Sequence, residues 1–354
     1  MKISKFLAFT LVLAICISFL LADAFAGTGR RTGTAGAQEL LIPVSAAGAA
    51  LGGANIANVK GIDAVFWNPA GLAASSHSGE AMFSHMNYIA DINMNYVAAN
   101  FNAGGLGTLG FDIKTLDFGD IPVTTEESPD GTGEMFSPNF ITLGLTYSRT
   151  MTDRIHFGVN AKFVSEKVMQ VAARGLAFDL GLQYTTTVGV RAGVVLKNIG
   201  TNMKFDGNDL EVFTKDVSDR PDANGKNTRL VLASFELPVS YELGLAYDYK
   251  IGELNTLSMM GTFMNNNFSL DEYRLAAEYN YNNFVFLRGS YLLGYDADED
   301  KIRVSDEDAY LWGPSFGGGI NLSVGASMGI KFDYAYRVTA LFDNNQWFSM
   351  TLTF

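Results

Sequence analysis

The stretch Gln346-Trp347-Phe348-Ser349-Met350-Thr351-Leu352-Thr353-Phe354 decides the fold. Its apolar residues Phe348, Met350, Leu352 and Phe354 fall at every second position, and the three positions between them are Ser or Thr. Successive side chains of a β-strand point to opposite faces, so this period of two indicates a strand with one apolar face. The rest of the chain shows which solvent that face meets.

The same period of two recurs in thirteen further segments. They are about as long as the roughly 9–11 residues that a tilted strand needs to cross a bilayer. With the last segment they give fourteen predicted strands: 80–89, 94–102, 106–114, 139–149, 154–166, 174–185, 188–199, 238–249, 256–264, 271–281, 284–294, 313–323, 326–337 and 346–354.

The connections between these segments alternate in length. Residues 115–138, 200–237 and 295–312 are long, and short connections such as 103–105 and 282–283 separate them. Long loops on one side and short turns on the other are typical of bacterial outer-membrane barrels. We therefore predict an all-β fold: a 14-stranded antiparallel transmembrane β-barrel over residues 80–354, located in the bacterial outer membrane. We expect Phe354 to act as the barrel-closing signal.

The first 26 residues have the pattern of a secretory signal peptide. Lys2 and Lys5 precede an apolar run, and Ala24-Phe25-Ala26 forms a cleavage box of small residues. We expect cleavage after Ala26. The chain's one cysteine, Cys16, lies in this segment, so the mature chain would have neither a disulfide nor a cysteine-based metal site.

Composition and motifs exclude several classes of function. The net charge of −12 argues against nucleic acid as a partner. The glycine pattern of residues 105–110 continues as a strand rather than a helix, so it does not predict a dinucleotide cofactor. His156 has no catalytic partner near it in sequence. We expect no enzyme activity, no catalytic residues and no cofactor.

A calcium site is the open alternative for the acidic loop of residues 296–307. Its spacing resembles a calcium-binding loop, but Lys301 stands where the sharp turn requires glycine. The prediction is therefore a solvated acidic loop without a metal.

Charged residues of both signs lie on the polar faces of the predicted strands, where they would point into the lumen. We expect most of them to form structural ion pairs that hold the wall and the plug rigid, rather than to bind substrate. The lumen charges selected on this basis are Arg191, Glu242, Arg274, Glu278, Arg288, Lys331 and Asp333.

Residues 27–79 precede the barrel and do not alternate. Their middle is rich in Ala and Gly and largely apolar, which predicts a hatch packed inside the lumen. The hatch motif Asn68, Pro69, Ala70 and Gly71 predicts a rigid corner, since Pro69 fixes its own backbone angle and restricts Asn68.

Several of these segments resemble the PorV/PorQ family, which lies within the FadL-like group of long-chain fatty acid transporters. The resemblance rests on LLIPVS (40–45), ALGGA (50–54) and FWNPAGL (66–72), with later pieces AFDLGL (177–182) and LKNIG (196–200). It implies a fourteen-stranded barrel with an N-terminal hatch.

The resemblance also implies two functions. PorV-type proteins take part in type IX protein secretion or surface attachment, and the length of this chain favours that type. The alternative is a FadL-like channel for small hydrophobic molecules. Expected partners are outer-membrane lipid, the barrel-assembly machinery and either secreted cargo and secretion-system subunits or a hydrophobic small molecule.

Overall fold

The computed structural model describes residues 33–214, 226–296, 299–305, 310–325 and 328–354. The expected signal peptide, residues 1–26, lies outside this part of the chain. None of the helices among the described residues is long and apolar enough to cross a membrane.

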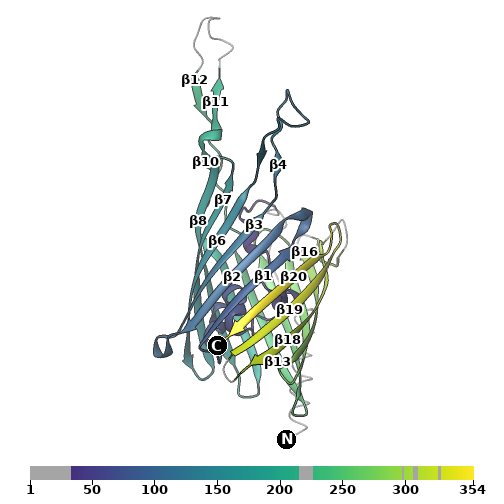
Figure 1. Cartoon of the computed structure of the whole chain (residues 1–354). Helices are drawn as coiled ribbons and strands as arrows, with labels where there is room; N and C mark the ends of the chain where they lie inside the picture. The colour runs from purple at the N-terminus through teal and green to yellow at the C-terminus, as the bar shows by residue number, and fades with distance from the viewer. Residues whose placement is uncertain (1–32, 215–225, 297–298, 306–309, 326–327) are drawn as a thin grey trace, which may run out of the picture.

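Fourteen antiparallel strands form a closed barrel (Figure 1). Each strand pairs with its neighbours in the chain, and β20 pairs with β1 from Glu80 opposite Thr353 to Asn87 opposite Gln346. The fourteen predicted strands are confirmed, with boundaries shifted by a few residues. They are β1 (Gly79–Asn87), β2 (Asn93–Asn102), β3 (Thr108–Asp117), β6 (Asn139–Thr152), β7 (Ile155–Val168), β8 (Val171–Thr185), β9 (Val190–Gly200), β13 (Ser240–Ile251), β14 (Asn255–Asn266), β15 (Asp271–Tyr281), β16 (Val285–Asp296), β18 (Trp312–Val324), β19 (Met328–Thr339) and β20 (Asn345–Thr353).

The apolar face of β20 points out of the barrel. Phe348, on the outer face, is 52% exposed, whereas Trp347, on the lumen face, is fully buried. The same alternation holds around the wall, so the outside is an apolar surface and the inside is polar. A closed barrel with such a surface leaves no unpaired strand edge in lipid, which identifies an outer-membrane β-barrel.

The long connections all leave the barrel at one end, as predicted (Figure 1). Two of them form arms: β4 (Ile121–Pro122) pairs with β5 (Met135–Phe136), and β11 (Glu211–Thr214) pairs with β12 (Lys226–Arg229). The same end also has a connection of only two residues, Met169 and Gln170, so length alone does not mark the side. Other elements at this end are η5 (Ile89–Asp91), β10 (Asp206–Gly207), η7 (Asn208–Leu210) and β17 (Lys301–Arg303).

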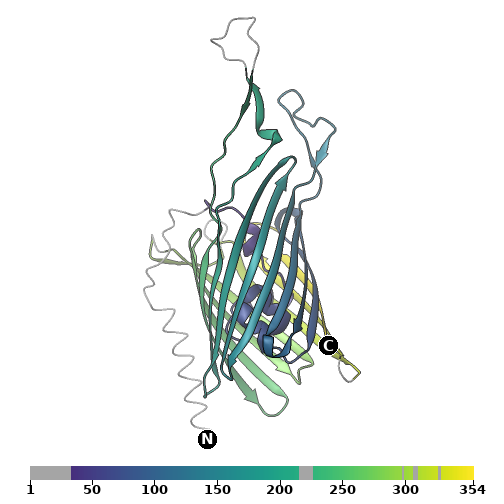
Figure 2. The same cartoon turned by 90° about the vertical axis from the view of Figure 1, so that its left-hand side faces the viewer.

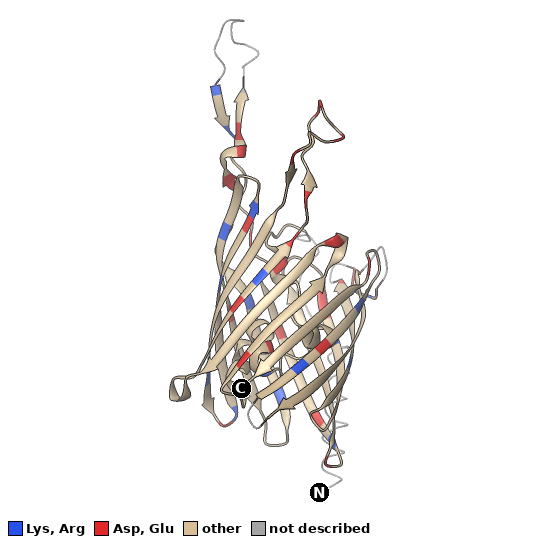
Figure 3. Cartoon of the chain, in the orientation of Figure 1, with Lys and Arg blue, Asp and Glu red and all other residues tan. Residues whose placement is uncertain are grey.

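The two arms differ in charge (Figure 3). Residues 118–138, which carry β4 and β5, contain five acidic residues and neither Lys nor Arg. The other arm has both signs, and Arg229 pairs with Asp206 near its base. The long-loop end of the barrel therefore carries one acidic arm and one arm with charges of both signs.

The N-terminal segment lies inside the barrel and fills much of it (Figure 2). Its short helices suit its composition, since Ala and Gly allow close packing but Pro and Gly prevent long helices. Most of its residues from Ala46 to Leu72 are buried. Its elements are η2 (Gln38–Leu41), α2 (Ala46–Ala50), η3 (Gly61–Asp63), α3 (Ala64–Trp67) and η4 (Pro69–Ala74).

A lipid-facing charge should be costly on this wall. We expect Phe348→Lys to lower the free energy of unfolding by about 2–4 kcal/mol, the range for a cation near the bilayer midplane. Urea unfolding in lipid vesicles measures it. Val324→Lys, near the turn that precedes β19, is the matched control and should cost at most about 1 kcal/mol. Equal costs at the two positions would contradict the assigned lipid-facing depth.

Candidate functional site

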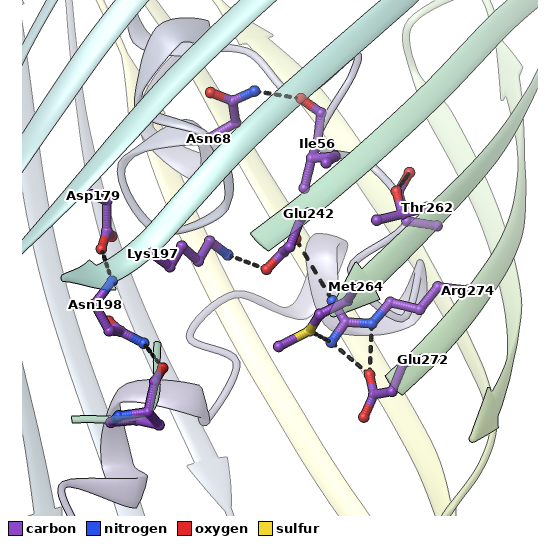
Figure 4. Close-up of polar contacts among 12 residues, drawn as sticks. Ile56, Asn68, Asp179, Lys197, Asn198, Glu242, Thr262, Met264, Glu272 and Arg274 are labelled. Atoms are coloured by element: carbon purple, nitrogen blue, oxygen red, sulfur yellow. Dashed lines mark hydrogen bonds and ion pairs between the residues drawn. The ribbon is translucent and has the colours of Figure 1, made fainter. Parts of the chain in front are cut away.

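The hatch motif is a capped corner pressed against the wall. Asn68 is fully buried and is the N-cap of η4, where its side-chain oxygen accepts a hydrogen bond from the Ala70 amide at 3.2 Å. Its Nδ2 donates to the Ile56 carbonyl at 2.8 Å (Figure 4) and to the Leu182 carbonyl of β8 at 3.3 Å. Pro69 occupies the first helical position, where no amide hydrogen is needed. The motif thus fixes the turn and attaches it to the wall.

Glycines in the wall make room for this corner. A Cβ added at Gly158 of β7 would lie 2.2 Å from the Pro69 carbonyl carbon, and one at Gly181 of β8 would lie 2.1 Å from Asn68 Oδ1. Both separations are far below van der Waals contact. The two wall positions therefore admit only glycine as long as the hatch stays in place.

Wall side chains also satisfy the backbone polar groups of the hatch. Such bonds come from strands all around the barrel, so the hatch is fastened on every side rather than hinged at one point. They include Lys114 to the Glu39 carbonyl (2.5 Å), Ser148 to Ala70 (2.9 Å), Gln183 to Ile56 (3.0 Å), Thr262 to Ala54 (3.1 Å), Ser290 to Ala50 (2.9 Å), Trp347 to Pro43 (3.0 Å), and Ser349 accepting from the Ala46 amide (2.8 Å).

The hatch contributes one buried carboxyl group of its own. Glu39 is 4% exposed, and Glu166 of β7 accepts a hydrogen bond from the Ala37 amide beside it. Burial, and after it the negative charge of Glu166, raise the pKa of Glu39 to about 8. Both effects favour the neutral form of the Glu39 carboxyl group.

A cavity of about 220 Å³ lies between the hatch and the wall. It reaches the strand ends that carry the long loops, since Asn266, Trp312 and Asn345 line it. Its apolar lining comes mainly from the hatch, and its polar lining comes mainly from β9, β13–β15, β19 and β20. We call it the main cavity. Apolar lining residues are Leu40, Leu41, Ile42, Pro43, Phe66, Trp67, Met264, Leu292 and Trp312.

A chain of ion pairs forms the polar side of the main cavity (Figure 4). Glu242 Oε1 lies 3.1 Å from Lys197 Nζ, and Glu242 Oε2 lies 3.8 Å from Arg274 Nη1. Arg274 Nη2 also pairs with Glu272 at 2.6 Å. All four side chains are at most 11% exposed, so solvent screens these pairs only weakly.

A β-bulge adjoins Lys197 in this chain of ion pairs. Lys197 and Asn198 together oppose the single residue Asp179 in the pairing of β8 with β9. Asn198 has a positive φ of 59°, and its amide donates to Asp179 Oδ1 at 2.8 Å (Figure 4). Lys197 faces the lumen by the alternation of β9, and the bulge turns Asn198 to the same side, so both side chains are buried.

Arg337 differs from the other lumen cations. It is 4% exposed, and among the described residues no carboxylate lies within ion-pair distance of it. Its guanidinium carbon lies 5.4 Å from the ring centres of both Trp312 and Trp347, and Nε donates to Ser315 Oγ at 3.0 Å. Asn345 is fully buried beside the same cavity, and neither polar atom of its side chain has a partner in the described part of the chain.

The structure places the other predicted lumen charges in two separate groups. Arg288 links Glu278 (2.5 Å) and Asp333 (2.7 Å), and Lys331 reaches Asp333 at 3.1 Å. Arg191 pairs with Asp248 at 2.5 Å. These groups face the lumen but do not line the main cavity, so of the seven predicted lumen charges only Glu242 and Arg274 belong to it.

The remaining predicted features lie at the ends of the barrel. Phe354 exchanges backbone hydrogen bonds with Gly79 at the start of β1, and its ring packs over that glycine. In the acidic loop, Asp296 and Glu299 both pair with Arg303, and parts of residues 296–307 lie outside the described chain. Within the described residues, no three His, Cys, Asp or Glu side chains come together as metal ligands.

Sequence reasoning missed the residues that distinguish the main cavity. Glu272, Trp312 and Asn345 sit at the ends of their strands, where alternation is hardest to assign. Arg337 lies in the predicted strand 326–337, but its lack of a carboxylate depends on neighbours from other strands. No sequence signal could have shown that.

No family model matches the chain, and no curated protein matches its sequence. Solved structures do match its fold. The CymD monoaromatic hydrocarbon channel aligns over 89% of this chain and 98% of its own, with a TM-score of 0.55 and 13% identity. The toluene transporter TbuX of Ralstonia pickettii aligns over 88% and 98% (TM-score 0.51, 13% identity), and the toluene transporter TodX of Pseudomonas putida over 86% and 96% (TM-score 0.51, 13% identity).

These likenesses establish the fold of the FadL-like barrel group. The predicted barrel with an N-terminal segment inside it is confirmed at that level. The finer resemblance to PorV/PorQ is not confirmed by any of these comparisons.

Proposed function

We propose that this protein is a channel that passes small hydrophobic molecules across the outer membrane through the main cavity. The observation that carries the proposal is a lumen cavity with a largely apolar hatch side, inside a barrel of this fold. Concave, mostly apolar sites with a few placed polar groups are the usual form of small-molecule sites. The proposal assigns no catalysis to the chain.

The polar side of the cavity suggests which hydrophobic molecules fit best. Three cations line it, Lys197, Arg274 and Arg337, against the two carboxylates Glu242 and Glu272. A ligand with one acidic group would supply the missing negative charge to Arg337, and its apolar part would lie against Leu292 and the hatch. We therefore propose that acidic, largely apolar molecules are preferred over neutral hydrocarbons.

Protein secretion is the second candidate, because the PorV/PorQ resemblance implies it. The observation in its favour is the pair of arms that stand beyond the barrel end (Figure 1). Phe213 and Val231 on one arm are 66% and 82% exposed, which suits contact with another protein. The arms do not explain a cavity inside the lumen, so we rank this function below transport.

Filling the cavity should block transport. Leu292 lines the main cavity and is 2% exposed, so Leu292→Trp should reduce decanoate uptake into cells that lack other such channels at least tenfold. Leu287→Trp is the matched control, since Leu287 lies on the same strand but is 57% exposed on the lipid side, and it should leave uptake unchanged. An unmodified chain that fails to accelerate uptake of either decanoate or toluene would refute the channel proposal.

A further inference from the structure

A second, smaller chamber lies beside the main cavity, between the hatch and the wall strands β2, β3, β6, β7 and β8. Its volume is about 20 Å³. Seven of its ten lining residues are polar or charged. The residues that line it are Leu40, Val44, Phe66, Tyr96, Asp112, Lys114, Thr142, Asn160, Lys162 and Asp179.

Polar atoms without partners surround this chamber. They are Tyr96 Oη, Asp112 Oδ1, Thr142 Oγ1 and Asn160 Oδ1, and none of them has a hydrogen-bond partner among the described residues. All four side chains are at most 6% exposed. An unpaired polar group in such a place costs about 1–3 kcal/mol, so four of them together require a ligand that forms hydrogen bonds.

The size of the chamber determines the class of ligand. About 10–15 Å³ is enough for one water molecule, and a buried water usually forms two to four hydrogen bonds. The chamber offers that space and those partners. Two lysines, Lys114 and Lys162, offset the carboxylates Asp112 and Asp179, so the lining carries no net charge that would favour an ion over water.

Phe66 separates this chamber from the main cavity. Phe66 and Leu40 line both spaces, and both belong to the hatch. The Phe66 ring centre lies 5.1 Å from Lys114 Nζ, which lines the chamber, and 5.1 Å from Lys197 Nζ, which lines the main cavity. Phe66, together with Leu40, therefore stands between the two spaces and lies beside a lysine of each.

The separating side chain is less constrained than its surroundings. Phe66 is only partly buried, whereas its helix neighbours Val65 and Trp67 are 0% and 3% exposed. A rotation of Phe66 needs no movement of the hatch backbone, which wall side chains hold on many sides. A rotamer change is a far smaller event than release of the hatch.

We propose that the chamber is a hydrated site and that Phe66 is the side-chain gate that closes it from the main cavity. Opening the gate would join the two spaces along the hatch without displacing the hatch. This inference concerns access of water and small polar solutes, so it does not depend on which hydrophobic molecule the channel carries.

Thiol labelling can test the gate. In a chain with Cys16 replaced by Ser, Thr142→Cys places one thiol in the chamber and Ser240→Cys places one in the main cavity. The probe is methanethiosulfonate ethylammonium, a small water-soluble reagent. We expect Phe66→Ala to accelerate labelling at position 142 at least tenfold and to leave labelling at position 240 within twofold.

Controls make the outcome decisive. Phe118→Ala removes an aromatic ring that packs on the same apolar cluster, against Phe140, but lines neither space, so it should not change labelling at position 142. Heat-modifiable gel mobility confirms that each variant is folded. Two results would overturn the proposed gate. One is fast labelling at position 142 with Phe66 present, and the other is labelling that stays slow in Phe66→Ala. Failure of decanoate uptake would overturn only the proposed function.

Discussion

Replacing Gly158 and Gly181 together by Val should convert the closed barrel into an open pore. The new side chains would occupy the space of the Asn68–Pro69 corner, since even a Cβ would come within 2.2 Å of it. The wall itself should tolerate Val, which favours strands, and the hydrogen bonds of the wall do not pass through the hatch. We expect single-channel conductance in planar bilayers to rise at least tenfold.

A matched variant separates this effect from a general loss of glycine. Gly289→Val on β16 is the control, because the nearest atoms to a Cβ there lie 3.9 Å away. Its conductance should equal that of the unmodified chain. Unchanged conductance in a folded Gly158→Val/Gly181→Val barrel would show that the hatch does not close the pore at this corner. The single variant Gly158→Ala provides a milder test if the double variant does not fold.

Replacing Glu242 by Ala should lower the free energy of unfolding by about 3–5 kcal/mol, the cost of removing one partner of a buried ion pair. Glu242 is 1% exposed and is the carboxylate that pairs with Lys197. Without it Lys197 would be a buried cation facing Arg274. Urea unfolding followed by tryptophan fluorescence in lipid vesicles measures the difference.

Two further variants show whether the cost comes from the unpaired charge. Glu299→Ala removes a fully exposed carboxylate of the long-loop end and should have no measurable effect. The double variant Lys197→Met/Glu242→Leu removes both charges and should recover more than half of the loss, since apolar pairs often replace buried ion pairs at little cost. A double variant as unstable as Glu242→Ala would contradict this explanation.

Much of the fold could be predicted because apolar and polar side chains alternate within each strand according to the face they occupy. Phe348 and Met350 alternate with Ser349 and Thr351 regardless of what lies across the lumen, so alternation is readable one strand at a time. The hatch could be predicted only as a segment that belongs inside. Its bond from the Ala46 amide to Ser349 joins residues 303 positions apart, and no local pattern encodes that pairing.

The site was less predictable than the fold, because it depends on register and on a bulge. Lys197 opposes Ser240 in the ladder and faces the lumen by the alternation of β9, from where it reaches Glu242, whereas the bulge turns Asn198 to the same side. A one-residue change of register would move either side chain to the lipid face. Charges on polar faces could thus be predicted, but their partners could not.

Fastening of the hatch to β20 has a consequence for the order of folding. The strand that closes the barrel carries Trp347 and Ser349, which bond to Pro43 and to the Ala46 amide. The hatch therefore cannot form these two hydrogen bonds until β20 has joined the wall. The wall closes and the last contacts between hatch and wall form in the same late step. Contacts between residues so distant in sequence form slowly. A kinetic intermediate with thirteen wall strands in place should accordingly still expose the hatch to protease.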